Sequence, residues 1–273
     1  MLQVKTPALV LEKEPGWNDE GNITLFTKNF GLVKVVASGV YRPGARLASW
    51  TEPPSRVVAE IALREKSPGY GRLFTLTLKD SFPHIRATYQ NSSWYYFYCF
   101  LLRDFLPVGE KSAQLYNLTK EVLSHQDSWE SEAKRDFNFT YFLVRLLRAQ
   151  GVCSRFSCCT GCDKQFEEDE TVYFSLNEQG LLCSDCSQKI ISQNSIGISL
   201  NYLSLLPVNK KLKLPAGLLR IHPEERKILE TCENSDTFAT DYANIFSRSS
   251  INDQTLAKVR NFLLIFLAPL LYS

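Results

Sequence analysis

Short stretches in which apolar and polar residues alternate dominate the first 80 residues of the chain. Alternation with a period of two is typical of β-strands that bury one face. We expect the Gly- and Pro-containing segment Ser67–Gly71 to form the hairpin turn between the last two stretches. The pattern predicts a small β-barrel or sandwich. Its five strands are expected at residues 8–11, 23–27, 32–37, 57–63 and 73–78.

From about residue 84 the apolar residues recur at steps of three and four, which is the spacing of amphipathic helices. The first helical stretch is crowded with aromatic residues, which we interpret as core packing, and it ends at Pro107. Another helix is expected to start at Pro223, because a proline followed by two acidic residues favours a helix N-terminus. Further helices are expected at residues 112–123 and 129–149. In the last helix, which begins near Asn252, one face carries Leu256, Val259, Leu263 and Leu267.

The composition is that of a folded globular protein. The chain has 273 residues, of which 44% are hydrophobic and 22% are charged, enough for two or three domains. The net charge of +2 does not by itself indicate a nucleic-acid partner. The N-terminus lacks a signal-peptide pattern, and the longest apolar run, Phe262–Tyr272, is shorter than the roughly 20 residues that span a bilayer. We therefore expect a cytoplasmic protein with reduced thiols and no membrane contact.

Two Cys-x-x-Cys pairs, separated by residues 163–182, carry the strongest chemical signal in the chain. Such pairs aim two sulfurs each at one point, and the intervening residues can form a hairpin that brings the pairs together. Zn²⁺ is the expected occupant, because it accepts four thiolates in a tetrahedron without redox chemistry. A site with four protein ligands has no open position, so one structural zinc ion is expected. The predicted ligands are Cys159, Cys162, Cys183 and Cys186.

Other interpretations of the cysteines stay open at this point. Disulfide bonds would need an oxidising compartment, a thioredoxin-like redox pair would explain only one of the two motifs, and chance spacing is the third alternative. Cys153 or Cys158 could also replace one of the four ligands. Gly161 favours Cys159 as the first ligand, because a metal-binding knuckle needs a tight turn there.

The segment Gly21–Thr51 contains no acidic residue but several basic ones, with Tyr41 and Trp50 interleaved. Basic side chains contact phosphates and aromatic rings stack on bases, as in five-stranded oligonucleotide-binding barrels. The same pattern also fits a solvated face with two aromatic residues in the core or at its rim. The basic residues are Lys28, Lys34, Arg42 and Arg46.

Motifs of catalysis are absent from the sequence. There is no phosphate-binding Gly-Lys-Ser/Thr motif and no Gly-x-Ser-x-Gly nucleophile motif. The three histidines are far apart along the chain, and the four-cysteine pattern leaves no open position on a metal. The sequence therefore predicts a protein that is not an enzyme.

Several short segments resemble those of one known family and occur along the chain in the same order. They lie at residues 23–27, 30–31, 39–46, 76–83, 101–110 and 180–186. The family is that of the bacterial recombination mediator RecO. After Cys186 the resemblance is limited to the final amphipathic helix. This chain departs from the family at Ser38, where many relatives are basic, and in the unusual Cys158–Cys159 doublet.

The resemblance implies an α+β fold, in which an N-terminal OB-fold barrel is followed by a mostly helical domain that a four-cysteine zinc module interrupts. The expected parts are residues 1–80 for the barrel, 81–152 and 191–273 for the two parts of the helical domain, and 153–190 for the zinc module.

The resemblance also implies a non-enzymatic, nucleoid-associated DNA repair factor. Members of the family bind single- and double-stranded DNA, anneal complementary strands and act with RecR to place RecA on strands coated by single-strand-binding protein. Their helical domain receives the C-terminal tail of that coating protein. An alternative hypothesis is a zinc-stabilised protein-interaction adaptor that does not bind DNA directly.

For this sequence we expect phosphate contacts from Lys28, Lys34, Arg42 and Arg46, with Tyr41 as a stacking residue. In the last helix, Lys258 and Arg260 lie beside the apolar Leu263, and this group is the candidate site for an acidic tail with an apolar end. The alternative for these three is the solvated edge of a helix packed in the core.

Overall fold

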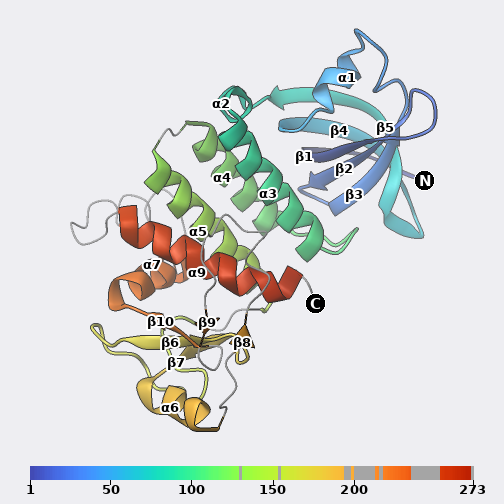
Figure 1. Ribbon diagram of the computed structural model, residues 1–273. Helices are drawn as coiled ribbons and strands as arrows, with labels where there is room; N and C mark the ends of the chain where they lie inside the picture. The colour runs from blue at the N-terminus through green and yellow to red at the C-terminus, as the bar shows by residue number, and fades with distance from the viewer. Residues whose placement is uncertain are drawn as a thin grey trace. The chain divides into compact units, whose positions relative to one another are not determined.

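The computed structural model describes residues 1–128, 131–152, 155–193, 198–199, 213–214, 218–234 and 253–271 (Figure 1). Contacts group the chain into two compact units, Met1–Trp129 and Glu130–Ser273, and each is described by itself. The boundary lies inside the segment 81–152, for which one helical domain is expected. The division into four parts stays a prediction.

Five strands form a closed barrel in the first unit. Their order around the barrel is β1-β2-β3-β5-β4, with β3 and β5 parallel and the other neighbours antiparallel. This barrel, with the helices and the cysteine cluster that follow it, confirms the predicted fold. The strands are β1 (Leu2–Pro15), β2 (Gly21–Thr27), β3 (Gly31–Ala37), β4 (Ser55–Arg64) and β5 (Ser67–Asp80).

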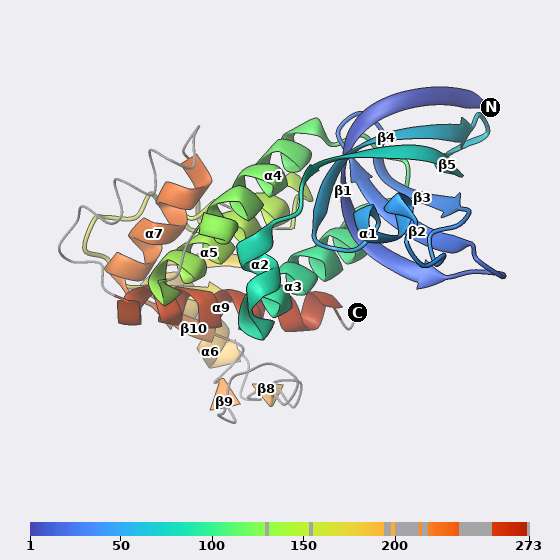
Figure 2. The same ribbon diagram turned by 90° about the horizontal axis from the view of Figure 1, so that it is seen from above.

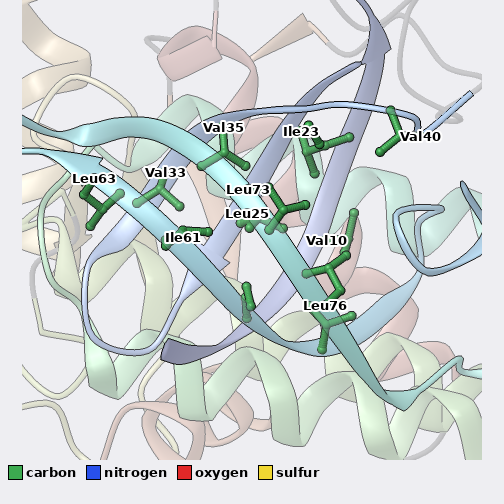
Figure 3. Close-up of a cluster of buried hydrophobic side chains, with 14 residues drawn as sticks. Val10, Ile23, Leu25, Val33, Val35, Val40, Ile61, Leu63, Leu73 and Leu76 are labelled. Atoms are coloured by element: carbon green, nitrogen blue, oxygen red, sulfur yellow. The ribbon is translucent and has the colours of Figure 1, made fainter. Parts of the chain in front are cut away.

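Inward-facing residues from all five strands fill the barrel, as Figure 3 shows; they alternate with outward residues except at the bulges. The short helix α1 (Arg46–Trp50) lies at one end, where Leu47 and Trp50 pack against the same core (Figure 2). Trp50 is thus a half-buried residue at the rim of the core, which fits the alternative interpretation of the aromatic pattern. The labelled core side chains are Val10, Ile23, Leu25, Val33, Val35, Val40, Ile61, Leu63, Leu73 and Leu76.

Strand β1 is longer than the four apolar residues that predict it. Its first half pairs with β4 and its second half with β2, and a bulge between Val10 and Glu12 lets it turn from one partner to the other. The two ends of β1 have no alternating pattern of apolar and polar residues, because the buried residues of this strand lie mainly in its middle. The ends of β1 are therefore set by backbone pairing with β4 and β2 and not by the burial of apolar side chains.

The predicted turn at Ser67–Gly71 is wrong, because this segment is the beginning of strand β5. The chain turns earlier, between Arg64 and Ser67, which pair with each other at the end of the β4–β5 ladder. Gly71 is required for close approach to β4: a Cβ atom there would lie 2.2 Å from the carbonyl oxygen of Ala62. This glycine therefore marks a close approach between the backbones of the paired strands β4 and β5, and not a turn.

Helices of the first unit cover the outer surface of β1 and β2. The helices are α2 (Pro83–Ala87), α3 (Tyr89–Phe105) and α4 (Ala113–Ser128). The hydroxyl of the fully buried Tyr95 on α3 donates a hydrogen bond to the carbonyl oxygen of Val10 on β1. The ring of Tyr116 on α4 packs edge-on against Phe26 of β2, with centroids 5.8 Å apart. The aromatic crowding of α3 thus serves core packing in part, while Tyr96 on its outer face is exposed.

The second unit packs three helices beside a small sheet. Helices α5 (Glu132–Ala149), α7 (Pro223–Asn234) and α9 (Asp253–Leu271) contact one another, and α7 starts at the predicted Pro223. The predicted apolar face of α9 is buried throughout. The remaining elements are β6 (Val172–Ser175), β7 (Gly180–Leu182) and β10 (Leu218–Ile221) in one sheet of order β10-β6-β7, the pair β8 (Ile198–Ser199) and β9 (Lys213–Leu214), and α6 (Ser184–Gln193).

One side chain of the small sheet joins it to α9. The ring of Phe174 on β6 is fully buried and contacts Phe262 and Phe266, with centroids 4.9 and 4.8 Å apart and both contacts T-shaped. Edge-to-face contacts of this kind stabilise beyond the area that they bury. Among the described helices, none has both the length and the apolar character needed to cross a membrane.

We expect Phe26→Ala to lower the free energy of unfolding of the first unit by about 3–5 kcal/mol, because it leaves a cavity between β2 and α4. Phe74→Ala is the matched control. Its ring is 50% exposed on the barrel, so a change within about 0.5 kcal/mol is expected. Urea denaturation followed by circular dichroism measures both variants, and equal losses would contradict the packing described.

Candidate functional site

Four sulfur atoms of the second unit converge on one point. The Sγ atoms of Cys159, Cys162, Cys183 and Cys186 all lie within 4.8 Å of one another. The Sγ atoms of Cys162 and Cys183 are 3.8 Å apart. Tetrahedral zinc with bonds of about 2.3 Å requires sulfurs about 3.8 Å apart. The structure therefore brings together the four predicted ligands at a spacing that fits this metal.

The first cysteine pair lies in a tight turn fixed by backbone hydrogen bonds. The amide of Cys159 donates to the carbonyl oxygen of Lys164 at 2.9 Å, and that of Asp163 donates to the oxygen of Cys159 at 2.8 Å. Asp163 has a positive φ of 55°, so the left-handed residue of the turn is not Gly161. A Cβ atom on Gly161 would lie 3.3 Å from the Sγ atom of Cys186. Gly161 is thus explained by its closeness to the second pair.

The second pair follows the predicted hairpin. Strands β6 and β7 pair antiparallel, so that Cys183 comes directly after β7 and Cys186 lies in the first turn of α6. The amide N–H of Cys183 donates to the Sγ atom of Cys159 at 3.4 Å, which links the two pairs. The hairpin is what makes two motifs distant in sequence into one site.

The other cysteines do not join this cluster in the part of the chain that the structure describes. Cys158 is half-buried and pairs through its backbone with Gln165, and Cys153 lies outside the described residues. All the described cysteines are free thiols, which disfavours a disulfide framework. That these four cysteines bind a metal stays a prediction.

The thiols of Cys159 and Cys186 differ in pKa. Burial raises the pKa of Cys159, but hydrogen bonds from the backbone amides of Cys183, Gly161 and Cys162 and from the Cys162 thiol outweigh burial and lower it to about 7. Burial, followed by hydrogen bonding with the neighbouring thiols, raises the pKa of Cys186 to about 12. Metal binding to thiols releases their protons, so zinc affinity at this cluster should rise with pH.

An arginine of α7 holds the loop beside the cysteine cluster. Arg226 is buried, and its Nη2 group donates to the carbonyl oxygens of Glu167 at 2.5 Å and Glu168 at 3.1 Å. Its guanidinium also lies over the ring of Phe166, 5.3 Å from the centroid. The acidic run that begins at Glu167 is therefore attached to α7 by its backbone, which keeps the loop against the helices. Arg226 is a residue that sequence reasoning missed.

Three of the predicted phosphate contacts are exposed on the barrel. Lys28 lies in the β2–β3 turn, Lys34 in the middle of β3, and Arg46 at the start of α1. Within the described residues, none of the three side chains has an ion pair or a hydrogen bond. Strand β3 has seven residues and spans roughly 20 Å, so Lys28 just before it and Lys34 within it lie along one strand, while Arg46 lies on the separate helix α1.

Folding brings acidic residues from other parts of the chain next to the segment Gly21–Thr51, which contains none itself. Asp19, from the β1–β2 turn, accepts from Arg42 at 2.9 Å. Tyr41 lies over Lys13, whose Nζ atom is 4.6 Å from the ring centroid, and burial followed by the nearby carboxylates of Glu52 and Glu14 raises the pKa of Tyr41. Arg42 and Tyr41 are thus less available to a ligand than the sequence suggests.

One cation of the barrel was missed because it follows the wrongly predicted turn. Arg72 on β5 donates through Nη2 to Glu20 at 2.9 Å and to the hydroxyl of Ser38 at 2.7 Å. The guanidinium of Arg72 therefore lies beside Ser38.

Lys258, Arg260 and Leu263 do not form one exposed surface. Leu263 is fully buried in the core, while Lys258 is exposed. Arg260 donates to the buried Asp136 at 2.7 Å and lies 3.7 Å from Glu132. This is the arrangement of a helix packed in the core with one solvated cation, which is the alternative considered for these residues.

Comparison with known proteins assigns the chain to a family. The family model described as "Recombination protein O C terminal" matches residues 86–232, which is more than half of the chain. The chain belongs to the RecO family. The protein named DNA repair protein RecO in Syntrophomonas wolfei is 24% identical over 230 residues, 84% of this chain and 88% of the relative. The protein of the same name in Exiguobacterium sibiricum is 25% identical over 256 residues, 92% and 97% of the two chains.

We expect Arg260→Met to lower the free energy of unfolding of the second unit by about 3 kcal/mol at pH 8, because it leaves the carboxylate of Asp136 buried without its cation. Burial already raises the pKa of Asp136, and Arg260 is the main group that lowers it. Without Arg260 the folded-state pKa rises further above the unfolded value. Stability lost at high pH then returns as Asp136 takes up a proton, so the loss is smaller at pH 5.

Lys258→Met is the matched control for this prediction. The side chain is exposed two residues earlier on the same helix, and a change within about 0.5 kcal/mol is expected at either pH. Thermal denaturation at the two pH values measures both variants. An equal loss for the two, or a loss of the Arg260 variant that grows at low pH, would contradict the buried ion pair.

Proposed function

We propose that this protein is a DNA-binding recombination mediator in DNA repair. On this proposal it binds and anneals single- and double-stranded DNA, and acts with RecR and single-strand-binding protein to help load RecA. The observation that carries the proposal is membership of the RecO family, whose curated relatives over most of this chain are named DNA repair proteins. The proposed role is that of a binding protein and not of an enzyme.

The barrel supports direct DNA binding by its charge. The exposed cations of Lys28, Lys34 and Arg46 have no protein partner among the described residues. Unpaired cations release counterions from phosphates when they bind, which is a source of affinity that does not depend on sequence. The adaptor alternative gives these cations no role. The two hypotheses therefore differ in whether the protein binds an oligonucleotide with an affinity that falls as salt rises.

For the cysteine cluster we propose one structural zinc ion. Four thiols at tetrahedral spacing suit Zn²⁺, and they leave no position for a substrate. The ion would tie the turn at Cys159 to the β6–β7 hairpin, and Phe174 and Arg226 would then hold the assembled module against α9 and α7. The zinc is thus scaffolding for the second unit.

The free cations are tested by Lys28→Ala/Lys34→Ala/Arg46→Ala. For single strands the slope of log affinity against log salt changes by about 0.7 for each phosphate that is no longer neutralised, so the triple variant should flatten it by about 2. Arg42→Ala is the control, and its effect should be smaller because Asp19 already neutralises Arg42. Fluorescence anisotropy of a labelled oligonucleotide over a salt series measures both. An unchanged slope would place the DNA elsewhere, and wild-type protein without salt-dependent binding would favour the adaptor.

The metal is tested by its stoichiometry in purified protein. We expect one zinc per chain in the wild type, and loss of zinc together with a lower melting temperature in Cys159→Ser and Cys183→Ser, because three thiolates bind more weakly and the module unfolds without metal. Cys158→Ser, next in sequence to a ligand but outside the cluster, should retain the ion. Elemental analysis after dialysis decides this. Wild-type protein that is stable without metal would refute the site.

A further inference from the structure

The outer surface of the barrel is free along only some of its strands. On β1 the outward residues Leu9 and Leu11 are buried, and on β2 the outward Phe26 is fully buried against α4. These strands cannot receive a ligand without displacing helices. The neighbouring pair β3–β5, by contrast, carries exposed side chains on its outer face. A ligand of this barrel therefore meets β3 and β5 first.

The outer face of β5 alternates aromatic and cationic side chains. Tyr70 is 44% exposed and Phe74 is 50% exposed, and Arg72 lies between them. The intervening Leu73 points into the barrel core (Figure 3). Across the parallel ladder, Lys34 of β3 pairs directly with Tyr70. Two rings and two cations thus share one surface, and four residues of strand place the rings about 13 Å apart.

The backbone turns Phe74 outward at a bulge. In the β4–β5 ladder Leu73 pairs with Ile61 and Thr75 with Glu60, so Phe74 has no partner on β4. Bulges of this kind re-aim a side chain and are common next to functional sites. Leu73 before the bulge and Leu76 after it both point into the core, so Phe74 lies on the outer face. Its exposure is therefore a property of the strand path and not of a loose loop.

The charges beside the rings favour a nucleic acid over an acidic or neutral protein surface. Lys34 has no partner among the described side chains. Arg72 is ion-paired with Glu20, but this contact and the hydrogen bond to Ser38 both use Nη2, which leaves Nη1 and Nε to donate to a phosphate. The nearby acid on the other side of β5, Glu60, accepts from the amide of Gln3 on β1. Rings that alternate with cations along one line match the alternation of bases and phosphates in a single strand.

We propose that the outer face of β3 and β5 is the path of a single-stranded nucleic acid, with Tyr70 and Phe74 each stacking on one base. Lys34 and Arg72 contact the phosphates between and beside these bases. This inference rests on the proposed function of DNA binding and adds where the strand lies and what its bases touch. Neither ring was a candidate in the sequence.

The test compares ring variants with a matched aromatic control. Tyr70→Ala and Phe74→Ala should each weaken binding of a labelled oligothymidylate by roughly 5- to 100-fold, because one base no longer has a ring to stack on. Tyr70→Phe keeps the ring and should bind like the wild type. Tyr96→Ala removes a ring that is 52% exposed on α3, away from this face, and should also bind like the wild type.

Two further arms separate stacking from charge. Ring variants should keep the salt dependence of the wild type, because every cation that meets a phosphate is still present. They should also bind duplex DNA as the wild type does, because paired bases are not free to stack. An oligonucleotide of abasic residues should bind the wild type and the ring variants with the same reduced affinity.

The outcomes distinguish this inference from the function on which it rests. Wild-type protein that binds no oligonucleotide overturns both. Ring variants that bind oligothymidylate as tightly as the wild type overturn the stacking path alone, leave DNA binding in place, and assign the face to a protein partner. Equal losses with abasic, duplex and single-stranded probes also overturn stacking, since the variants would then act through the fold. Selective loss with the base-bearing single strand supports the path.

Discussion

Three residue pairs between β3 and β5 close the barrel, and the rest of the first unit depends on them. The parallel rungs join residues 34–36 to 70–72, and without them the apolar inner faces of five strands would open to water. Closure requires β5 to pass very close to β4, which only a glycine at position 71 permits. Closure also determines which side chains lie on the outer surface, because the residue that follows an inward Leu or Val points outward. The exposed row of cations and rings is thus a consequence of how the sheet closes.

The second unit meets a different physical problem, because its small sheet has too little apolar area to be stable by itself. Its stabilising contacts come from three sources: the converging sulfurs, the Phe174 ring between two phenylalanines of α9, and the Arg226 side chain under the acidic loop. Each source joins segments that are far apart in the sequence. A bound ion would strengthen the first and, through the shared hairpin, hold the other two in place.

Local patterns predicted a large part of this structure. The cysteine pairs, the centres of the strands, the start of α7 and the apolar face of α9 all follow from spacing within a few residues. What the sequence could not supply is long-range. Arg260 looks like a free surface cation until Asp136, on another helix, is placed beside it. Ser67–Gly71 resembles a turn because glycine and proline favour turns. Here Gly71 is required instead because the backbone of β4 lies too close for a side chain.

The same long-range effect changes the interpretation of charge on the barrel. Folding brings Asp19 to Arg42, so the segment without acids in sequence is partly neutralised in space, and it brings Glu20 to Arg72 on β5. If DNA contacts only the three predicted cations that have no partner, Lys28, Lys34 and Arg46, the electrostatic share of the proposed binding is small, because three phosphate contacts give a salt slope of only about 2 for a single strand. Tight binding then needs a contribution that salt does not screen. Stacking on exposed rings is such a contribution, and because it requires unpaired bases, it would also give this barrel a preference for single strands over duplex.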